Sequence, residues 1–258
     1  MLAYTETGAA DAPPLLIAHG LYGSGRNWGV IAKRLSDTRR IITVDMRNHG
    51  NSFHADSQSY HDMAGDLGQV IDHIGAPMDV LGHSMGGKAA MVLALTRPNS
   101  VQRLIVGDIA PVGYGHSQIQ YIEAMRAVDL GAVTRRSDAN AQLAALGVEP
   151  ALCAFLTQSL DVAGKRWRYN LDTLAAEMPE IIGFPALDGQ FDGPTLFLSG
   201  AQSDYVRPEH RATIRALFPK SRFAKLPKAG HWLHADDPRG FEATVRAYLD
   251  ASQHRDLT

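Results

Sequence analysis

The sequence predicts an α/β fold, built on a mostly parallel sheet with helices on its faces. Short, continuously apolar runs at residues 14–18, 41–44, 104–107 and 195–198 are typical of strands that are covered on both faces. Segments with the helical spacing of apolar residues separate most of these runs. Strands that alternate with helices pair in parallel, so the loops at their carboxyl ends meet at one edge of the sheet.

The composition fits one large α/β domain with an ordinary charge balance. The chain has 258 residues, 45% of them hydrophobic, which is enough for a sizeable core. A formal net charge of -2, without any cluster of Lys and Arg, speaks against nucleic acid or an anionic membrane surface as the main partner. We expect a small-molecule partner, and we expect the chain to be a monomer or a small homo-oligomer.

Three features of the chain favour a cytoplasmic location. Cys153 is the only cysteine, so an internal disulfide cannot form and a reducing compartment fits. Residues 1–12 contain acids and no apolar core, unlike a secretion signal. No later stretch approaches the roughly 20 apolar residues of a membrane-spanning helix.

The first half of the chain contains three predicted helices. Apolar positions recur at helical spacing over residues 28–35 and again over residues 59–75, where Ser59 is the expected N-cap and Gly75 the expected C-cap. The third helix follows a strand that ends near residue 82, and Pro98 is placed to end it.

The second half departs from the strand–helix alternation. Residues 112–184 show helical periodicity only, and we expect no strand there. Because this stretch follows a strand whose end should face the site, we expect a helical cap at 112–184 on a core formed by 1–111 and 185–258. The alternative is a set of bundled helices that only stabilise the domain. A helix begins at Pro208, a strand covers 222–226, and the final helix contains Phe241 and Leu249.

Ser84 is the candidate nucleophile. It stands in Gly82-His83-Ser84-Met85-Gly86, the Gly-x-Ser-x-Gly spacing of a sharp turn between a strand and a helix. Side chains two residues before and after the serine would collide in so tight a turn, hence the glycines. The turn would hold Ser84 in a strained conformation with its hydroxyl exposed at the helix N-terminus.

A serine hydroxyl needs a base to remove its proton, and the base needs a third group to orient it. His231 follows the last strand in a Gly-His-Trp loop and is the expected base, whereas neighbouring His83 should serve in packing. His234 lies only three residues after His231 and is a second, weaker candidate for the base. Two carboxylates stand at strand ends in the required order Ser, acid, His: Asp108 and Asp204.

Backbone N–H groups should stabilise the negative charge that develops on the attacked carbonyl oxygen. The turn supplies the N–H of Met85. The loop after the strand at 14–18 begins with His19, Gly20 and Leu21. The N–H of Leu21 is the expected second donor, and we expect His19 and Gly20 to hold the loop around it.

At this point the chain resembles the α/β-hydrolase superfamily, and more narrowly the small bacterial acyl esterases related to the mitochondrial abhydrolase-domain proteins. The segments that carry the resemblance are His19–Gly23, Asp45–Ser52, Gly82–Lys88, Asp108–Pro111 and Gly230–Trp232. The resemblance implies an α/β-hydrolase fold with a helical cap inserted after the sixth strand. It also implies a serine hydrolase acting through an acyl-enzyme on esters or thioesters of short to medium acyl chains, with neither metal nor organic cofactor.

The resemblance also bears on individual residues. Superfamily members commonly carry the acid in the loop after the strand at 195–198, but the matching position here is Ser203, followed by Asp204. The chain resembles the narrower family, which places the acid earlier, at the end of the strand before the cap. This resemblance implies Asp108 as the acid, with Ser203 in a supporting place. Asp45 and Arg47 would brace a loop.

Other chemistries fit the same three residues. A cofactor-free perhydrolase, a carbon–carbon bond hydrolase or a peptidase could use them, and a hydrolase scaffold can also serve as a non-catalytic small-molecule receptor. The sequence leaves the acyl group and the leaving group open.

Overall fold

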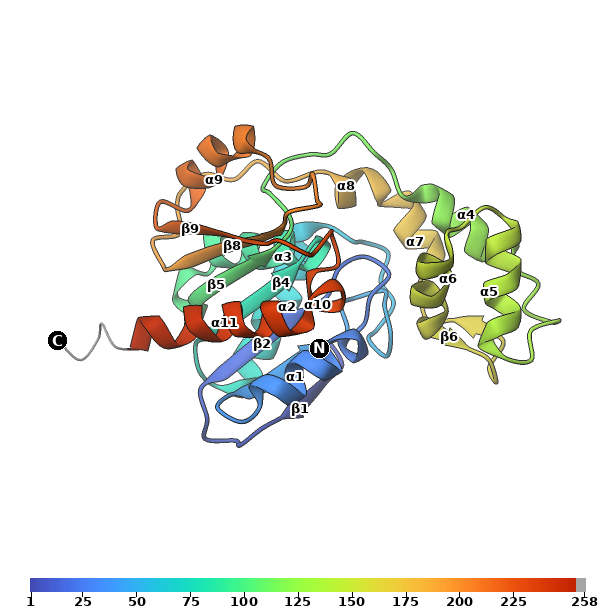
Figure 1. The fold of residues 1–258 in the computed structure, drawn as a ribbon, viewed down its shortest axis with the longest axis horizontal. Helices are drawn as coiled ribbons and strands as arrows, with labels where there is room; N and C mark the ends of the chain where they lie inside the picture. Colours follow the sequence, from blue (N-terminus) through green and yellow to red (C-terminus); the bar gives the residue numbers. More distant parts are fainter. Residues whose placement is uncertain (254–258) are drawn as a thin grey trace.

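The computed structural model describes residues 1–253, and its centre is a seven-stranded sheet (Figure 1). From edge to edge the strands are β1 (Tyr4–Thr7), β3 (Arg40–Val44), β2 (Pro14–Ala18), β4 (Met78–His83), β5 (Val101–Gly107), β8 (Thr195–Gly200) and β9 (Ser221–Leu226). All neighbouring pairs are parallel except β1 with β3. The mostly parallel sheet expected from the sequence is confirmed.

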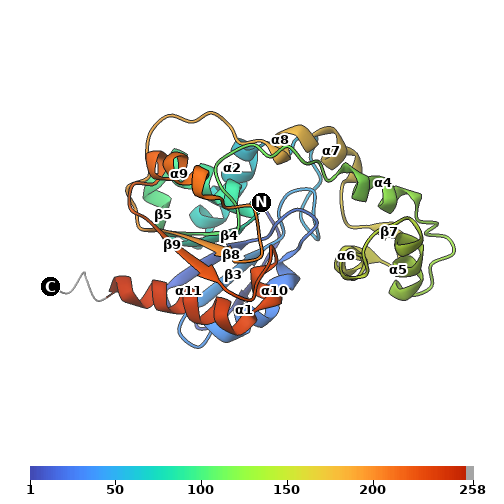
Figure 2. The same ribbon diagram turned by 45° about the horizontal axis from the view of Figure 1, so that its top comes forward.

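Helices cover both faces of this sheet, because successive residues of a strand point to opposite sides. Leu15 and Ile17 pack in one core cluster, and Leu16 and Ala18 in the other. The first cluster lies under α1 (Gly29–Leu35), α10 (Leu233–Asp236) and α11 (Pro238–Gln253); the second lies under α2 (Tyr60–Ile74), α3 (Met85–Thr96) and α9 (Arg211–Leu217). Figure 2 shows α1 and α11 on the opposite side of the sheet from α2 and α9.

The expected helix ends are present. The Ser59 hydroxyl accepts a hydrogen bond from the Asp62 N–H, which caps α2, and Gly75 ends it in the left-handed region at φ 88°. Short 3-10 helices occur as η1 (Gly25–Trp28), η2 (Pro98–Ser100), η3 (Thr157–Ser159) and η4 (Pro208–His210). Pro98 follows the last residues of α3, as expected.

Between β5 and β8 the chain forms what we call the helical insert, residues 112–184. It contains α4 (Ile119–Ala127), α5 (Arg136–Ala145), α6 (Pro150–Leu156), α7 (Leu171–Ala176) and α8 (Met178–Ile182). Both views place α4 to α7 beside one end of the sheet, away from the C-terminal helix (Figures 1 and 2).

Two expectations about strands were wrong. The insert contains an antiparallel pair, β6 (Leu160–Asp161) and β7 (Arg166–Trp167), whose two-residue strands are too short to give a periodic pattern. The insert also follows β5, which is the fifth strand of the chain and not the sixth. Only one strand, β1, lies beyond β3 at that edge of the sheet, which leaves five strands before the insert.

Within residues 1–253, no helix combines the length and the apolar character needed to cross a bilayer.

Candidate active site

Ser84 lies at the tip of the turn between β4 and α3. Its backbone has φ 52° and ψ -120°, a strained conformation for a residue with a side chain. The glycines make the turn possible: a Cβ on Gly82 would lie 2.2 Å from the Gly86 carbonyl oxygen, and one on Gly86 would lie 2.5 Å from the Ala18 carbonyl oxygen. The turn therefore leaves no room for side chains at these two positions.

The structure brings Ser84, His231 and Asp108 together from three loops. The Ser84 Oγ lies 3.1 Å from the His231 Nε2, and the His231 Nδ1 lies 2.8 Å from the Asp108 Oδ2. Since a carboxylate only accepts, Nδ1 carries the hydrogen and Nε2 is free to accept the serine proton. The three side chains form one continuous hydrogen-bond chain.

Asp108, and not Asp204, contacts the imidazole. Asp108 is completely buried, with a left-handed backbone at φ 48°, and its Oδ1 accepts from the Gly200 N–H at 3.1 Å. Ser203 donates its hydroxyl to the other carboxylate oxygen. Asp204 is exposed, and its carbonyl oxygen accepts from the Arg207 Nε at 3.0 Å.

Two neighbours hold His231 in place. His83 is buried, as expected of a packing residue, but its Nε2–H also donates to the His231 carbonyl oxygen at 2.8 Å. Burial lowers the pKa of His83 well below its usual range, so it stays neutral. Tyr205 stacks on the His231 ring with centroids 4.0 Å apart. No sequence pattern pointed to Tyr205, because its ring reaches His231 only through the fold.

His234, the weaker candidate for the base, lies elsewhere. Its ring stacks on Trp28 with centroids 4.1 Å apart, and burial lowers its pKa to about 4. Its Nδ1 is buried and without a hydrogen-bond partner among the described residues.

The two expected backbone donors, Leu21 and Met85, line the same cavity as Ser84. Within residues 1–253 neither N–H is bonded to another protein group. His19 fixes the loop: its Nδ1–H donates to the Gly20 carbonyl oxygen at 2.7 Å, and its Nε2 accepts from the Met46 N–H at 2.9 Å. Because a peptide's C=O and N–H point in opposite directions, holding the Gly20 oxygen also orients the Leu21 N–H.

Burial keeps this supporting histidine neutral. It lowers the pKa of His19 to about 4, so Nε2 remains an acceptor at neutral pH.

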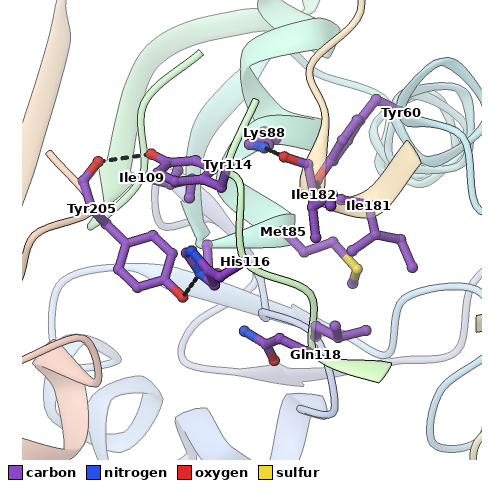
Figure 3. A pocket seen from close by; sticks show the side chains of 12 residues that line it. Tyr60, Met85, Lys88, Ile109, Tyr114, His116, Gln118, Ile181, Ile182 and Tyr205 are labelled. Carbon is purple, nitrogen blue, oxygen red and sulfur yellow. Dashed lines mark hydrogen bonds between the residues drawn. The ribbon is translucent and has the colours of Figure 1, made fainter. Parts of the chain in front are cut away.

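Two cavities of unequal size meet at Ser84. The small cavity has a volume of about 40 Å³, and its lining includes Met85, Lys88 and Ile181 (Figure 3). The large cavity has a volume of about 400 Å³ and includes His231 and Trp232 in its lining. The helical insert contributes walls to both.

Lys88 ends one of the segments that carry the family resemblance, but no role in the site was predicted for it. It is 1% exposed, and its Nζ donates to the carbonyl oxygens of Ile182 and Gly183 at the end of α8 (Figure 3). Its ammonium also lies 4.8 Å from the centre of the Tyr114 ring. Burial lowers the pKa of Lys88 to about 7. A single lysine one turn into an apolar helix does not indicate a functional role by its sequence position.

The loop after β3 braces the site, as expected for Asp45 and Arg47. Asp45 accepts from the N–H groups of Gly25 and Asn51 at 2.7 and 2.8 Å. Arg47 forms a buried, two-pronged ion pair with Asp66 at 2.6 and 3.0 Å.

In the part of the chain that the structure describes, no cluster of three or more His, Cys, Asp or Glu side chains could hold a metal ion.

The chain has relatives over almost its whole length. It is 42% identical over 253 residues to the sn-1-specific diacylglycerol lipase ABHD11 of Mus musculus, covering 94% of this chain and 82% of the relative. It is 36% identical to the esterase YbfF of Escherichia coli, covering 96% and 97%. A solved structure titled a marine microorganism esterase superimposes with a TM-score of 0.90 at 35% identity, covering 96% of this chain and 98% of that one.

Residues 13–238 match the family described as alpha/beta hydrolase fold. The sheet order, the turn at Ser84 and these relatives agree, and the chain belongs to the alpha/beta hydrolase fold family.

Proposed function

We propose that the chain is a carboxylesterase-type serine hydrolase that cleaves small-molecule esters through an acyl-enzyme. The hydrogen-bond chain from Ser84 through His231 to buried Asp108 supports this proposal most directly. The relatives named as esterases and lipases support ester hydrolysis as the reaction class.

In the first half of the reaction, His231 Nε2 takes the proton of the Ser84 hydroxyl as Oγ attacks the ester carbonyl carbon. The carbonyl oxygen gains negative charge, and the N–H groups of Leu21 and Met85 donate to it. The carbon–oxygen bond to the alcohol then breaks, and His231 gives its proton to the departing alcohol oxygen.

In the second half, water gives a proton to His231 Nε2 and its oxygen attacks the acyl carbon. The bond to Ser84 Oγ breaks, the proton returns to Oγ, and a carboxylic acid leaves. Buried Asp108 orients the imidazole and stabilises its protonated form in both halves.

We also propose that the helical insert is a cap, with 1–111 and 185–258 as the hydrolase core. Tyr121, Leu152 and Phe155 of the insert line the large cavity, and Ile181 and Ile182 line the small one. These contacts favour a role in substrate choice over one in stability alone.

The nucleophile can be tested by labelling. After treatment with a serine-directed phosphonate, we expect mass spectrometry to locate the adduct on Ser84, and Ser84→Ala to lose hydrolysis of nitrophenyl acetate by at least about 10⁴-fold. Ser203→Ala is the matched control and should still be labelled at Ser84. Undiminished turnover by Ser84→Ala would refute the proposal.

Turnover separates this proposal from a non-catalytic receptor on the same scaffold. A receptor would bind esters without releasing the acid. Product analysis by mass spectrometry also separates hydrolysis from perhydrolysis and from carbon–carbon bond cleavage.

A further inference from the structure

We propose that the two cavities sort the two halves of the ester: the small one takes a short acyl group of two to about four carbons, and the large one takes a bulky, uncharged alcohol. This inference rests on the proposed ester hydrolysis and names its substrate class.

The direction of the leaving group assigns the cavities. The alcohol oxygen must lie within reach of His231 Nε2, because that nitrogen returns the proton. Of the two cavities, His231 and its neighbours Gly230 and Trp232 line only the large one. The alcohol therefore extends into the large cavity.

The acyl group must extend in the direction that neither the carbonyl oxygen nor the alcohol occupies. The carbonyl oxygen faces the Leu21 and Met85 N–H groups, and the alcohol oxygen faces His231. Met85 and Lys88 line only the small cavity, and His231 does not line it, so we assign the acyl chain to the small cavity.

The volume of the small cavity limits the acyl chain. Its volume of about 40 Å³ is a tenth of the 400 Å³ of the large cavity, so a short acyl group fits it better than a long one does. We place the limit near a butyryl group.

The far wall of the small cavity is held by polar contacts. The Tyr60 hydroxyl donates to the Ile181 carbonyl oxygen at 2.5 Å, and the Lys88 ammonium donates to the next two carbonyls, those of Ile182 and Gly183. These bonds fix the end of α8, so a longer acyl chain cannot displace it without breaking them.

The large cavity suits an apolar alcohol. Its volume of about 400 Å³ is that of a pocket for a drug-sized molecule, and Tyr121, Leu152, Phe155 and Trp232 give it aromatic and aliphatic walls. None of its lining residues, all within the described part of the chain, is Lys or Arg, whereas Glu149 and Asp236 are among them. A leaving group that carries phosphates, such as coenzyme A, finds no cation there.

Two ester series test the assignment. In the first, the leaving group is nitrophenol and the acyl group grows from acetyl through butyryl to octanoyl; kcat/KM should fall at least about tenfold between butyryl and octanoyl. In the second, the acyl group is acetyl and the alcohol grows from ethanol through hexanol to 2-naphthylethanol; kcat/KM should rise or stay level. The neutral thioester S-hexyl thioacetate should be cleaved at least about tenfold more efficiently than acetyl-CoA.

A matched pair of variants assigns each half to its cavity. Ile181→Ala should improve octanoyl relative to acetyl esters at least about fivefold by opening the small cavity, and the milder Ile181→Val should shift the ratio the same way if the first variant folds poorly. Phe155→Ala should alter the ranking of alcohols and leave the ranking of acyl groups unchanged.

The outcomes distinguish this inference from the proposed function. Hydrolysis that favours long acyl groups and small alcohols overturns the sorting of the two halves, while ester hydrolysis stands. The same holds if Phe155→Ala changes the ranking of acyl groups and neither Ile181 variant does. Efficient cleavage of acetyl-CoA overturns the preference for an uncharged leaving group. Absence of turnover in both series by folded protein overturns the proposed function and the inference with it.

Discussion

Asp108 is the residue on which the orientation of the proposed base depends. Replacing it with Asn keeps the shape of the side chain but presents an amide N–H or C=O, which no longer fixes the productive tautomer of His231. By analogy with serine proteases, we expect Asp108→Asn to lower kcat about 10⁴-fold. Asp204→Asn, a change of an exposed carboxylate in the next loop, should lower kcat less than about threefold.

The measurement is kcat for both variants on nitrophenyl acetate, with folding checked by circular dichroism. A large loss confined to Asp204→Asn would transfer the role of the acid to that residue.

Among the single residues of the site, those at the motif positions were predictable from sequence. Ser84 has a spacing that requires a particular turn, and His231 has a position relative to the last strand. The residue pattern alone left the acid open between Asp108 and Asp204, because both follow strands close to β4 and a sequence contains no distances. The family resemblance favoured Asp108. Tyr205 and Lys88 act through contacts between distant segments, which the local pattern does not encode.

At the scale of one element, α8 depends on Lys88. In Lys88→Met the new side chain has a similar length, but the Gly183 carbonyl loses its Lys88 donor and the Ile182 carbonyl keeps only the Tyr114 N–H, at a local cost of about 1–3 kcal/mol. Amide exchange over Met178–Ile182 should therefore become about tenfold faster. Hydrogen exchange read by mass spectrometry measures this.

Exposed Lys225→Met is the matched control and should leave that exchange unchanged. The global free energy of unfolding is a poorer readout, since burying the ammonium itself costs free energy that the methionine avoids. Unaltered exchange at α8 in Lys88→Met would show that the contact does not hold the helix end.

The predictability of elements follows their length and burial. The buried parallel strands and the long capped helix α2 were read from apolar patterning, because each is long enough to repeat it. Strand β1 is a four-residue edge strand with two exposed positions, and β6 and β7 have two residues each. Pairing with a neighbour defines these short strands, and the neighbour is known only from the fold.

For the whole molecule, buried histidines make stability depend on pH. Burial lowers the pKa of His19 and His234 to about 4 and of His49 to about 3, and it also lowers the pKa of His83 well below its usual value. Between pH 6.5 and pH 4 the unfolded chain therefore binds more protons than the folded one, so stability falls as the pH falls. Each histidine contributes up to about 1.4 kcal/mol per pH unit, and four contribute about 5.

Against a total stability of about 5–15 kcal/mol, this slope predicts acid unfolding between about pH 5.5 and pH 4. Urea unfolding at pH 7.5, 6.5 and 5.5 measures the slope. His234→Phe keeps a ring on Trp28 and removes one titrating group, so it should reduce the slope by about a quarter. Equal stability at all three pH values would contradict the prediction.

The two ends of the helical insert lie side by side, since the Tyr114 N–H donates to the Ile182 carbonyl oxygen at 3.0 Å. Recombination can exchange a segment of this kind as a unit, because its replacement has only to begin and end at the same two neighbouring points. The groups proposed to break the ester bond all lie outside the segment, whereas Tyr121, Phe155 and Ile181 inside it shape both cavities. A lineage can thus inherit the reaction from one ancestor and the range of substrates from another.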